Sequence, residues 1–480
     1  MKKRLLLIST YVFFFLTSLY LGSVYIDPDF GWRLRLGSYI LENGIPATDI
    51  YSYTMPSFPF IDHEWLTHIG VASFHQLTGY TGLAFIAASI YIATLLLTTL
   101  KFDNNWRIAH VIFVGSVLLH HFGVKPQILS WLMTSIFVLA TLDSRWNTQW
   151  RYITPFFLMF WANIHGGFVV GIGIYTVKLI SDSVSTKRLS WTDSGFYLAS
   201  VIATLINPYG HRLWEEIVRT GSDARLRLQI LEWTPQFLYF NLSSFCIVAW
   251  YTTIFLRYFR STSLYERSLF VLLLIFGFSS SRNFPLWVVA ASPLVANRFE
   301  LFLNEARKNS ITKKRVHKMS IGFAVFIICA AVFELFFLNK EMHKYSESNQ
   351  YPVKAISYLR KNPSTGNMIS AYEWGGYLIL NYPEKKVFID GRMPSWRQDA
   401  KRHPAESPDA LDEFITFLTQ TKPMAPLVKK YNIDTILIPK KMIEPNKVTN
   451  NNKIIQKFKS TLKKNGFEPV YTDELAIIYR

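Results

Sequence analysis

The sequence predicts an α-helical polytopic membrane bundle of about eleven spans, followed by a C-terminal extracytoplasmic α/β domain. Half of the 480 residues are hydrophobic, and they occur in repeated blocks separated by short polar turns, which is typical of proteins that cross a membrane several times. Basic residues gather in alternate loops, the arrangement that orients such a protein. Past Asn339 the apolar blocks give way to shorter helix- and strand-length patterns.

The first predicted span runs from Leu5 to Ile26, and about 20 apolar residues suffice to cross a bilayer. The basic start Met1–Arg4 places the N-terminus in the cytoplasm, and because no small-residue cleavage site follows, we expect an uncleaved anchor. An odd number of spans in the inner (cytoplasmic) membrane then places the C-terminus on the extracytoplasmic side. The other spans are expected near residues 81–100, 108–122, 127–142, 152–164, 167–181, 195–207, 243–259, 268–281, 284–297 and 320–338.

The formal net charge of +18 raises the question of a nucleic-acid partner. Much of the excess lies in two loops, 257–267 and 298–318, where membrane orientation or contact with anionic headgroups accounts for it. No recognisable nucleic-acid-binding motif accompanies the charge, so we expect no such partner. Cys246 and Cys329 both fall inside predicted spans, which supports neither a disulfide scaffold nor a thiolate metal site.

Carboxylates and an arginine emerge directly after the first span, in the stretch Tyr25–Arg33. Asp27, Asp29 and Arg33 would meet a charged, lipid-borne substrate there, at the edge of the membrane. A structural interpretation is also open, because Asp-Pro after an apolar run commonly ends a helix and starts a turn. The following residues, Phe30–Glu42, predict an amphipathic helix lying flat at the membrane–water interface.

Further polar side chains gather in the loops predicted to face outside. His63 and Glu64 begin an apolar helix, where Glu64 either favours the helix N-terminus or completes a carboxylate cluster with the first loop. Lys125 and Arg282 stand at outer ends of short spans, where they either snorkel to the interface or bind phosphate or pyrophosphate. His165 is either a substrate-binding residue or a hydrogen-bonded residue of the bundle.

The C-terminal domain is predicted from its own pattern, and we place the boundary so that residues 1–344 form the membrane domain and residues 345–480 the α/β domain. Asp390 or Arg392, at the end of a predicted strand, could touch substrate or bond to each other. Helices are expected over 352–361, 409–419 and 452–464, strands over 367–371, 377–380, 386–389 and 434–439, and a hairpin over 468–479.

These motifs resemble the GT-C class of integral-membrane glycosyltransferases, and most closely the catalytic subunit of oligosaccharyltransferase. Asp27-Pro28 and Arg33 match the first-loop motif of that family, and Glu373–Tyr377 looks like a degenerate form of the aromatic motif that opens its soluble domain. The resemblance implies a polyprenyl-linked sugar donor and, for Asp27 alone, a role in holding a divalent cation such as Mg²⁺ or Mn²⁺. The sequence departs from the family in the loop His120–Gln127, which has no acid.

The expected function is therefore transfer of a sugar from a polyprenyl-phosphate-type donor to an envelope acceptor on the outer face. Asp27 is the first candidate for general base, with Asp29 and Glu64 in support, because a carboxylate can accept the proton of an acceptor hydroxyl. Lys125 and Arg282 would neutralise the leaving phosphate, and the expected substrate-binding set is completed by Arg33, His63 and His165.

Two other functions stay open. A polytopic transporter would place ionisable residues at mid-span and show inverted repeats, neither of which is evident. A non-catalytic envelope assembly protein would need the fold but not the outer-face carboxylates.

Overall fold

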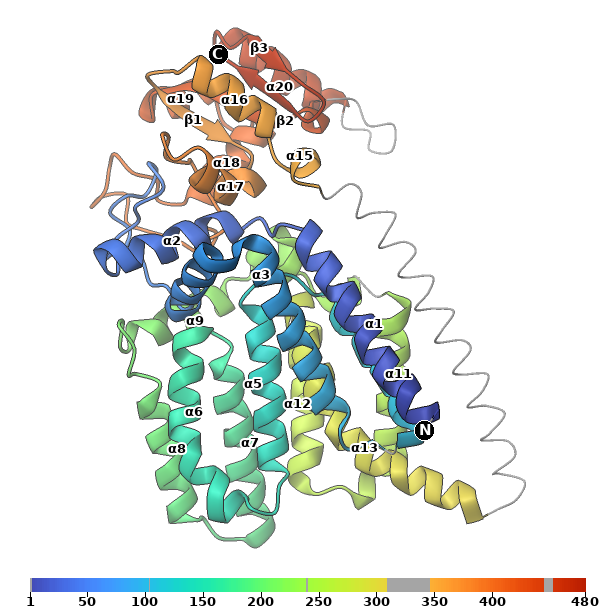
Figure 1. Ribbon diagram of the computed structural model, residues 1–480. Coiled ribbons are helices and arrows are strands. Elements are labelled where there is room, and N and C mark those ends of the chain that lie inside the picture. The colour runs from blue at the N-terminus through green and yellow to red at the C-terminus, as the bar shows by residue number, and fades with distance from the viewer. Residues whose placement is uncertain (1, 103, 239–240, 309–345, 444–451) are drawn as a thin grey trace. The chain divides into compact units, whose positions relative to one another are not determined.

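The computed structural model describes residues 2–102, 104–238, 241–308, 346–443 and 452–480 (Figure 1). The chain divides into two compact units. The first unit consists of Met1–Ser23, His63–Thr67 and Tyr80–Glu341, and the second of Val24–Asp62, His68–Gly79 and Met342–Arg480.

The second unit thus takes in two segments from the N-terminal half, which the sequence assigned to the membrane domain 1–344. Backbone and side-chain bonds fasten these segments to the C-terminal region. Thr54 Oγ1, for example, donates to the Phe388 carbonyl at 2.6 Å, and Tyr351 Oη donates to the Ile26 carbonyl at 2.8 Å.

The first unit is a bundle of α-helices that run alongside one another (Figure 1). Its helix starts carry local signals: Ser263 and Glu266 form a capping box at one helix, and Asn241 caps another. The helices are α1 (Lys2–Val24), α3 (Trp65–Thr99), α4 (Asn104–His120), α5 (Gln127–Thr141), α6 (Arg151–Ile164), α7 (Phe168–Thr186), α8 (Trp191–Ala203), α9 (Arg212–Ser222), α10 (Leu226–Gln229), α11 (Leu242–Arg257), α12 (Leu264–Ser279) and α13 (Phe284–Lys308). Residues His68–Gly79 of α3 belong to the second unit. Short turns of helix are η1 (Trp146–Trp150), η2 (Leu231–Trp233), η3 (Gln236–Leu238), η4 (Phe259–Ser261) and η5 (Ser281–Asn283).

Among the described residues, four helices are long and apolar enough to cross a membrane, and a bent helix pair could make a fifth crossing. The four are Lys3–Val24, Trp65–Thr99, Phe168–Thr186 and Ser281–Glu305, and the bent pair is Gln127–Thr141 with Trp146–Ile164. Helix α3 is two helices joined at Gly79, whose φ of +65° suits glycine, so the predicted span 81–100 corresponds to its second part. The count of about eleven spans stays a prediction, and the expected span 320–338 lies outside the described residues.

Aromatic side chains fill the core of the bundle. Trp131, Trp161 and Trp287 are fully buried, and the rings of Phe255 and Phe270 stack with centroids 3.9 Å apart. Large apolar side chains are also exposed on the outside of several helices, for example Phe156 on α6, Leu198 on α8 and Ile275 on α12. Extensive exposed apolar surface of this kind suits contact with lipid.

A four-stranded sheet of order β1-β2-β4-β3 lies in the second unit. β1 (Asn367–Ser370) pairs in parallel with β2 (Ile433–Pro439), which pairs antiparallel with β4 (Ala476–Tyr479), and the hairpin partner β3 (Pro469–Thr472) forms the exposed edge. The helices are α2 (Phe30–Asn43), α15 (Glu347–Gln350), α16 (Val353–Lys361), α17 (Gly375–Asn381), α18 (Ala410–Thr419), α19 (Met424–Lys430) and α20 (Asn452–Lys464), with the short turns η7 (Tyr372–Trp374) and η8 (Lys440–Met442).

Two of the predicted strands are wrong. The stretch 377–380 lies within the helix α17, and 386–389 contributes only an isolated bridge between Ser52 and Val387. A short apolar run buried on all sides has no periodicity that separates strand from helix. The helix expected over Phe30–Glu42 is confirmed as α2, and its side chains from Phe30 to Ile40 are largely buried within the second unit.

Close packing explains why α17 begins with paired glycines. α2 and α17 lie against each other, and a Cβ on Gly31 would come within 2.1 Å of the Gly376 carbonyl oxygen. A Cβ on Gly376 would in turn come within 2.2 Å of the Pro28 carbonyl oxygen. The Gly-Gly pair thus lets two backbones approach each other, which a side chain would prevent.

Candidate active site

The carboxylates of the first loop are held by the arginine that follows them. Arg33 donates from Nη1 to Asp27 Oδ1 at 2.9 Å and from Nη2 to Asp29 Oδ2 at 3.3 Å. The backbone N–H of Asp29 also donates to Asp27 Oδ1, at 3.0 Å. Asp27 and Arg33 are only 6% and 5% exposed, so this is a buried ion pair that also shapes the turn into α2.

This arrangement does not fit the divalent cation that the resemblance implies. Asp27 Oδ1 already accepts two hydrogen bonds, one of them from a guanidinium that neutralises its charge. Within the described part of the chain, no group of three or more His, Cys, Asp or Glu side chains is placed to hold a metal ion. The metal role of Asp27 stays a prediction, and we derive no step through a metal.

A second buried ion cluster lies in the same unit. Arg392 donates to both carboxylate oxygens of Asp390, at 2.8 and 2.6 Å, and to Asp49 Oδ1 at 2.8 Å. Burial by itself lowers the pKa of the Arg392 guanidinium, but the charges and hydrogen bonds of Asp390 and Asp49 outweigh it, so the pKa lies above its ordinary value. Four aromatic rings surround the guanidinium carbon at 5.0–5.9 Å, those of Trp32, Tyr51, Phe60 and Trp396.

Gly391 joins the two ion clusters. A Cβ at this position would come within 1.8 Å of Asp29 Oδ1, so the carboxylate of the first loop rests on the backbone of the Asp-Gly-Arg segment. The predicted mutual bond of Asp390 and Arg392 is confirmed. Asp49 was missed by sequence reasoning, because a single acid in an irregular loop carries no spacing signal.

Glu64 lies in the first unit, at the N-cap of α3, and its carboxylate makes no capping hydrogen bond. It is 3% exposed, and its Oε1 lies 3.3 Å from His165 Nε2 and 3.7 Å from His63 Nε2. Glu64 thus lies at the helix N-terminus, where its charge interacts favourably with the helix dipole, as one of its two sequence interpretations expects. The structure also brings together three of the predicted site residues, Glu64, His63 and His165.

Hydrogen bonds to the far side of the His165 ring define its tautomer. The backbone N–H of Gly167 donates to Nδ1 at 2.9 Å, and Ser130 Oγ lies 2.7 Å from the same nitrogen. A backbone N–H can only donate, so Nδ1 must be an acceptor and we infer that the ring proton is on Nε2. Nε2 lies 3.3 Å from Glu64 Oε1, so the imidazole turns the nitrogen that bears its proton to the side of that carboxylate without an aligned hydrogen bond.

The motif His165-Gly166-Gly167 owes its glycines to this packing. A Cβ on Gly167 would come within 2.2 Å of Ser130 Oγ, and one on Gly166 within 3.0 Å of the His63 ring. Trp161 Nε1 donates to Ser130 Oγ at 2.9 Å, which orients the serine. Sequence reasoning missed Ser130 and Trp161, since nothing in their own stretches distinguishes them from other core residues.

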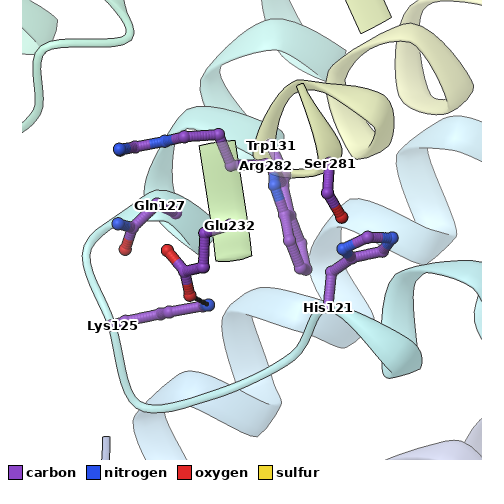
Figure 2. Close-up of a pocket in the computed structure, with 7 residues that line it drawn as sticks. All are labelled: His121, Lys125, Gln127, Trp131, Glu232, Ser281 and Arg282. Atoms are coloured by element: carbon purple, nitrogen blue, oxygen red, sulfur yellow. Dashed lines mark hydrogen bonds and ion pairs between the residues drawn. The ribbon is translucent and has the colours of Figure 1, made fainter. Parts of the chain in front are cut away.

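Lys125 and Arg282 line one pocket in the first unit (Figure 2). The cavity has a volume of about 40 Å³, enough for a compact polar group, since one water needs about 10–15 Å³. Lys125 Nζ donates to Glu232 Oε1 at 2.9 Å, while the Arg282 guanidinium lies over the ring of Trp233 at 4.5 Å. The lining residues are His121, Lys125, Gln127, Trp131, Glu232, Ser281 and Arg282.

The first turn of α5 connects this pocket with the Glu64 group. Gln127 and Trp131 line the pocket, and Ser130, between them on the same turn, holds His165. Residues three and four apart lie next to each other on a helix. Asp27, Asp29 and Arg33 belong to the second unit, so the predicted cluster of Glu64 with Asp27 and Asp29 stays a prediction.

The fold is that of the GT-C class of glycosyltransferases, and with its apolar helices it defines a multi-pass membrane protein. No protein-family model and no curated protein matches the sequence. The apo oligosaccharyltransferase of Archaeoglobus fulgidus is similar with a TM-score of 0.58, at 13% identity over 99% of this chain and 74% of that chain.

Two further structures agree. The same archaeal enzyme tethered to an acceptor peptide with an NVT sequon gives a TM-score of 0.55, at 13% identity over 98% of this chain and 74% of that one. ArnT from Cupriavidus metallidurans in the apo state gives 0.51, at 11% identity over 99% of this chain and 97% of that one. At such identities the likeness establishes the fold, and it confirms the resemblance that the sequence motifs indicated.

Proposed function

We propose that this protein is a membrane glycosyltransferase that moves a sugar from a polyprenyl-phosphate-type donor to an acceptor of the cell envelope. One observation carries the proposal beyond the fold. The buried carboxylate of Glu64 lies 3.3 Å from Nε2 of His165, whose ring is held on its other side by Ser130. Ser130 is on the first turn of α5, next to Gln127 and Trp131 of the pocket that contains Lys125 and Arg282. A proton acceptor and a pair of cations are the two groups that such a transfer needs.

The reaction can be written with these residues. The acceptor hydroxyl gives its proton to the Glu64 carboxylate, and its oxygen forms the new bond to the anomeric carbon. The bond from that carbon to the donor phosphate breaks, and its electron pair stays on the phosphate oxygen. Lys125 and Arg282 stabilise the charge that accumulates there, as preorganised cations do for a developing anion.

Glu64 takes first place as the base because its two neighbours are imidazoles. Asp27, by contrast, is paired with a guanidinium that neutralises it. Asp27 and Asp29 remain candidate catalytic residues in the second unit, and Arg33 is the residue that holds them. His63, whose side chain is 36% exposed, is a candidate for contact with the sugar or the acceptor beside Glu64.

The proposal includes a location. The N-terminus would lie in the cytoplasm and the region from Met342 onward outside the inner membrane, so that donor and acceptor meet at the outer face. The alternation of basic loops along the sequence supports this orientation.

Mass spectrometry of envelope glycans and lipid-linked sugars, with and without the protein, tests the proposed function. Cells that lack the protein should accumulate one polyprenyl-linked sugar and lose the same sugar from an envelope component. Expression of the wild type should restore both, and expression of Glu64→Gln should restore neither. Unchanged glycans and unchanged lipid-linked sugars in the deletion would contradict the proposal.

A further inference from the structure

Glu232 places a carboxylate inside a pocket whose other charged groups are cations. Its Oε1 accepts from Lys125 Nζ at 2.9 Å, and the two side chains point toward each other in Figure 2. Arg282 lines the same pocket and, within the described residues, forms no ion pair; its guanidinium stacks over Trp233 instead. Among the described residues, one of the two cations is therefore neutralised by a carboxylate and the other is not.

Two further polar atoms of this pocket are buried without a hydrogen-bond partner among the described residues. They are Nε2 of His121 and Oε1 of Gln127. Buried polar atoms are normally hydrogen-bonded, and orphaned ones call for an explanation such as a missing ligand. A ligand that accepts hydrogen bonds could satisfy His121 and the Gln127 amide, whose oxygen and nitrogen can exchange places by a flip.

The backbone around Glu232 is anchored, but its side chain can leave. Ser280 Oγ donates to the Glu232 carbonyl at 3.0 Å, and the Ser281 N–H donates to the Thr234 carbonyl at 2.8 Å. The Glu232 side chain is 50% exposed, whereas that of Lys125 is 15% exposed. Rotation of one side chain into solvent thus opens the ion pair with Lys125 and requires no movement of the loop.

We propose that the pocket binds a phosphate or pyrophosphate oxyanion and that Glu232 stands in for this anion until the ligand displaces it. The inference rests on the proposed function and deepens it, because it names a competitor within the chain for the phosphate that Lys125 and Arg282 would bind. A dianionic group would engage both Lys125 and Arg282, whereas the single carboxylate of Glu232 engages one of them. The cavity of about 40 Å³ has room for a small polar group beside the two cations.

Binding of inorganic pyrophosphate to the full-length protein, measured by calorimetry, is the first test. An exposed ion pair is worth about 0.2–1 kcal/mol, so Glu232→Gln should bind pyrophosphate more tightly, by up to about fivefold. Glu215→Gln is the matched control, because it removes an exposed glutamate of the same unit that pairs with His211 instead. Lys125→Met and Arg282→Gln should each weaken binding.

A double substitution isolates the competition. If Glu232 acts by occupying Lys125, its removal should gain little in a Lys125→Met background, and the non-additivity measures the coupling. Glu232→Ala provides a second variant with the same expectation, and the thermal unfolding of each variant shows whether it is folded. Nanodiscs containing a polyprenyl phosphate, compared with free pyrophosphate, distinguish a lipid-borne ligand from a free anion.

The outcomes separate this inference from the proposed function. Equal affinities of wild type, Glu232→Gln and Glu215→Gln would overturn the stand-in role. Absence of binding to both pyrophosphate and polyprenyl phosphate, in wild type and in Glu232→Gln alike, would overturn the anion pocket. Binding that follows the expected pattern, in a protein that transfers no sugar, would uphold this inference and contradict the proposed function alone.

Discussion

Asp49 and Arg392 form a 2.8 Å ion pair although 343 positions separate them in the sequence. Asp49 also accepts from the backbone N–H groups of Tyr51 and Ser52, so this one carboxylate organises its own loop and fastens it to the Asp-Gly-Arg segment. Both side chains are almost fully buried, because 0% of the side-chain surface of Asp49 and 2% of that of Arg392 is exposed.

Arg392→Met should strongly destabilise the second unit, because it leaves Asp49 and Asp390 as buried, uncompensated charges. Breaking a buried ion pair from one side costs about 3–5 kcal/mol. Limited proteolysis of the purified protein, read at sites in the second unit, would measure the effect. Arg360→Met is the control, since Arg360 pairs with Glu384 at the exposed surface. Equal proteolysis of the two variants would contradict the structural role of the cluster.

Gly391→Ala should disturb the first loop through Asp29. The new Cβ would fall 1.8 Å from Asp29 Oδ1, so the Asp29 carboxylate must turn away from Arg33 or the backbone must shift. Overpacking a buried site typically costs about 1–3 kcal/mol, and at the half-buried Gly391 we expect about 1 kcal/mol. Gly70→Ala is the control for space, because a Cβ on Gly70 meets no atom within 4 Å, and inside its helix the alanine should raise the midpoint slightly. Thermal unfolding should separate the two variants, and equal midpoints would refute the close contact of Asp29 with Gly391.

Nuclear magnetic resonance can test the His165 tautomer. In protein labelled with ¹⁵N-histidine, the His165 resonances, assigned by their loss in His165→Gln, should be those of the Nε2–H form at neutral pH. Ser130→Ala should leave the tautomer unchanged, because the Gly167 N–H still donates to Nδ1. A signal from the Nδ1–H form would show that His165 does not present a proton to Glu64.

Glu64→Gln keeps the size of the side chain and removes its charge. General-base catalysis typically contributes about 10²–10⁴-fold, so transfer from a polyprenyl-linked donor should fall by that order at unchanged expression. Asp27→Asn tests the other candidate in the same assay, and a comparable loss there would give Asp27 a catalytic part as well. Wild-type transfer by Glu64→Gln would remove Glu64 from the mechanism.

Cysteine labelling tests the orientation. In a Cys246→Ala, Cys329→Ala background, a cysteine at the exposed position Asn349 should react with an impermeant reagent added from outside, and a cysteine at the exposed position Lys187 should not. The expectation follows from the positive-inside distribution of basic loops. Labelling of Lys187→Cys from outside would invert the proposed topology.

The two unconfirmed strands show where sequence reasoning fails locally. Residues 377–380 are apolar and buried, and such a short run fits a helix as well as a strand. Their helix packs on α2, which lies more than three hundred positions earlier in the chain. By contrast, α16, α18 and β2 were located from the sequence because amphipathic spacing, a capping aspartate or a β-branched run marks each of them.

By itself, the sequence determined the class of protein: the apolar blocks require a membrane, and the Asp27–Arg33 motif indicated the fold that the solved structures confirm. It also offered Asp27, Asp29, Glu64, His165, Lys125 and Arg282 as site residues, because polar groups at the ends of apolar spans favour functional cavities, and their roles stay predictions. Only the tertiary structure decided which groups meet: Arg33 neutralises Asp27, His165 turns its Nε2 to Glu64, and Glu232 occupies Lys125. Such pairs join distant parts of the chain, and the period of a helix or a strand records only the burial of each element's own face.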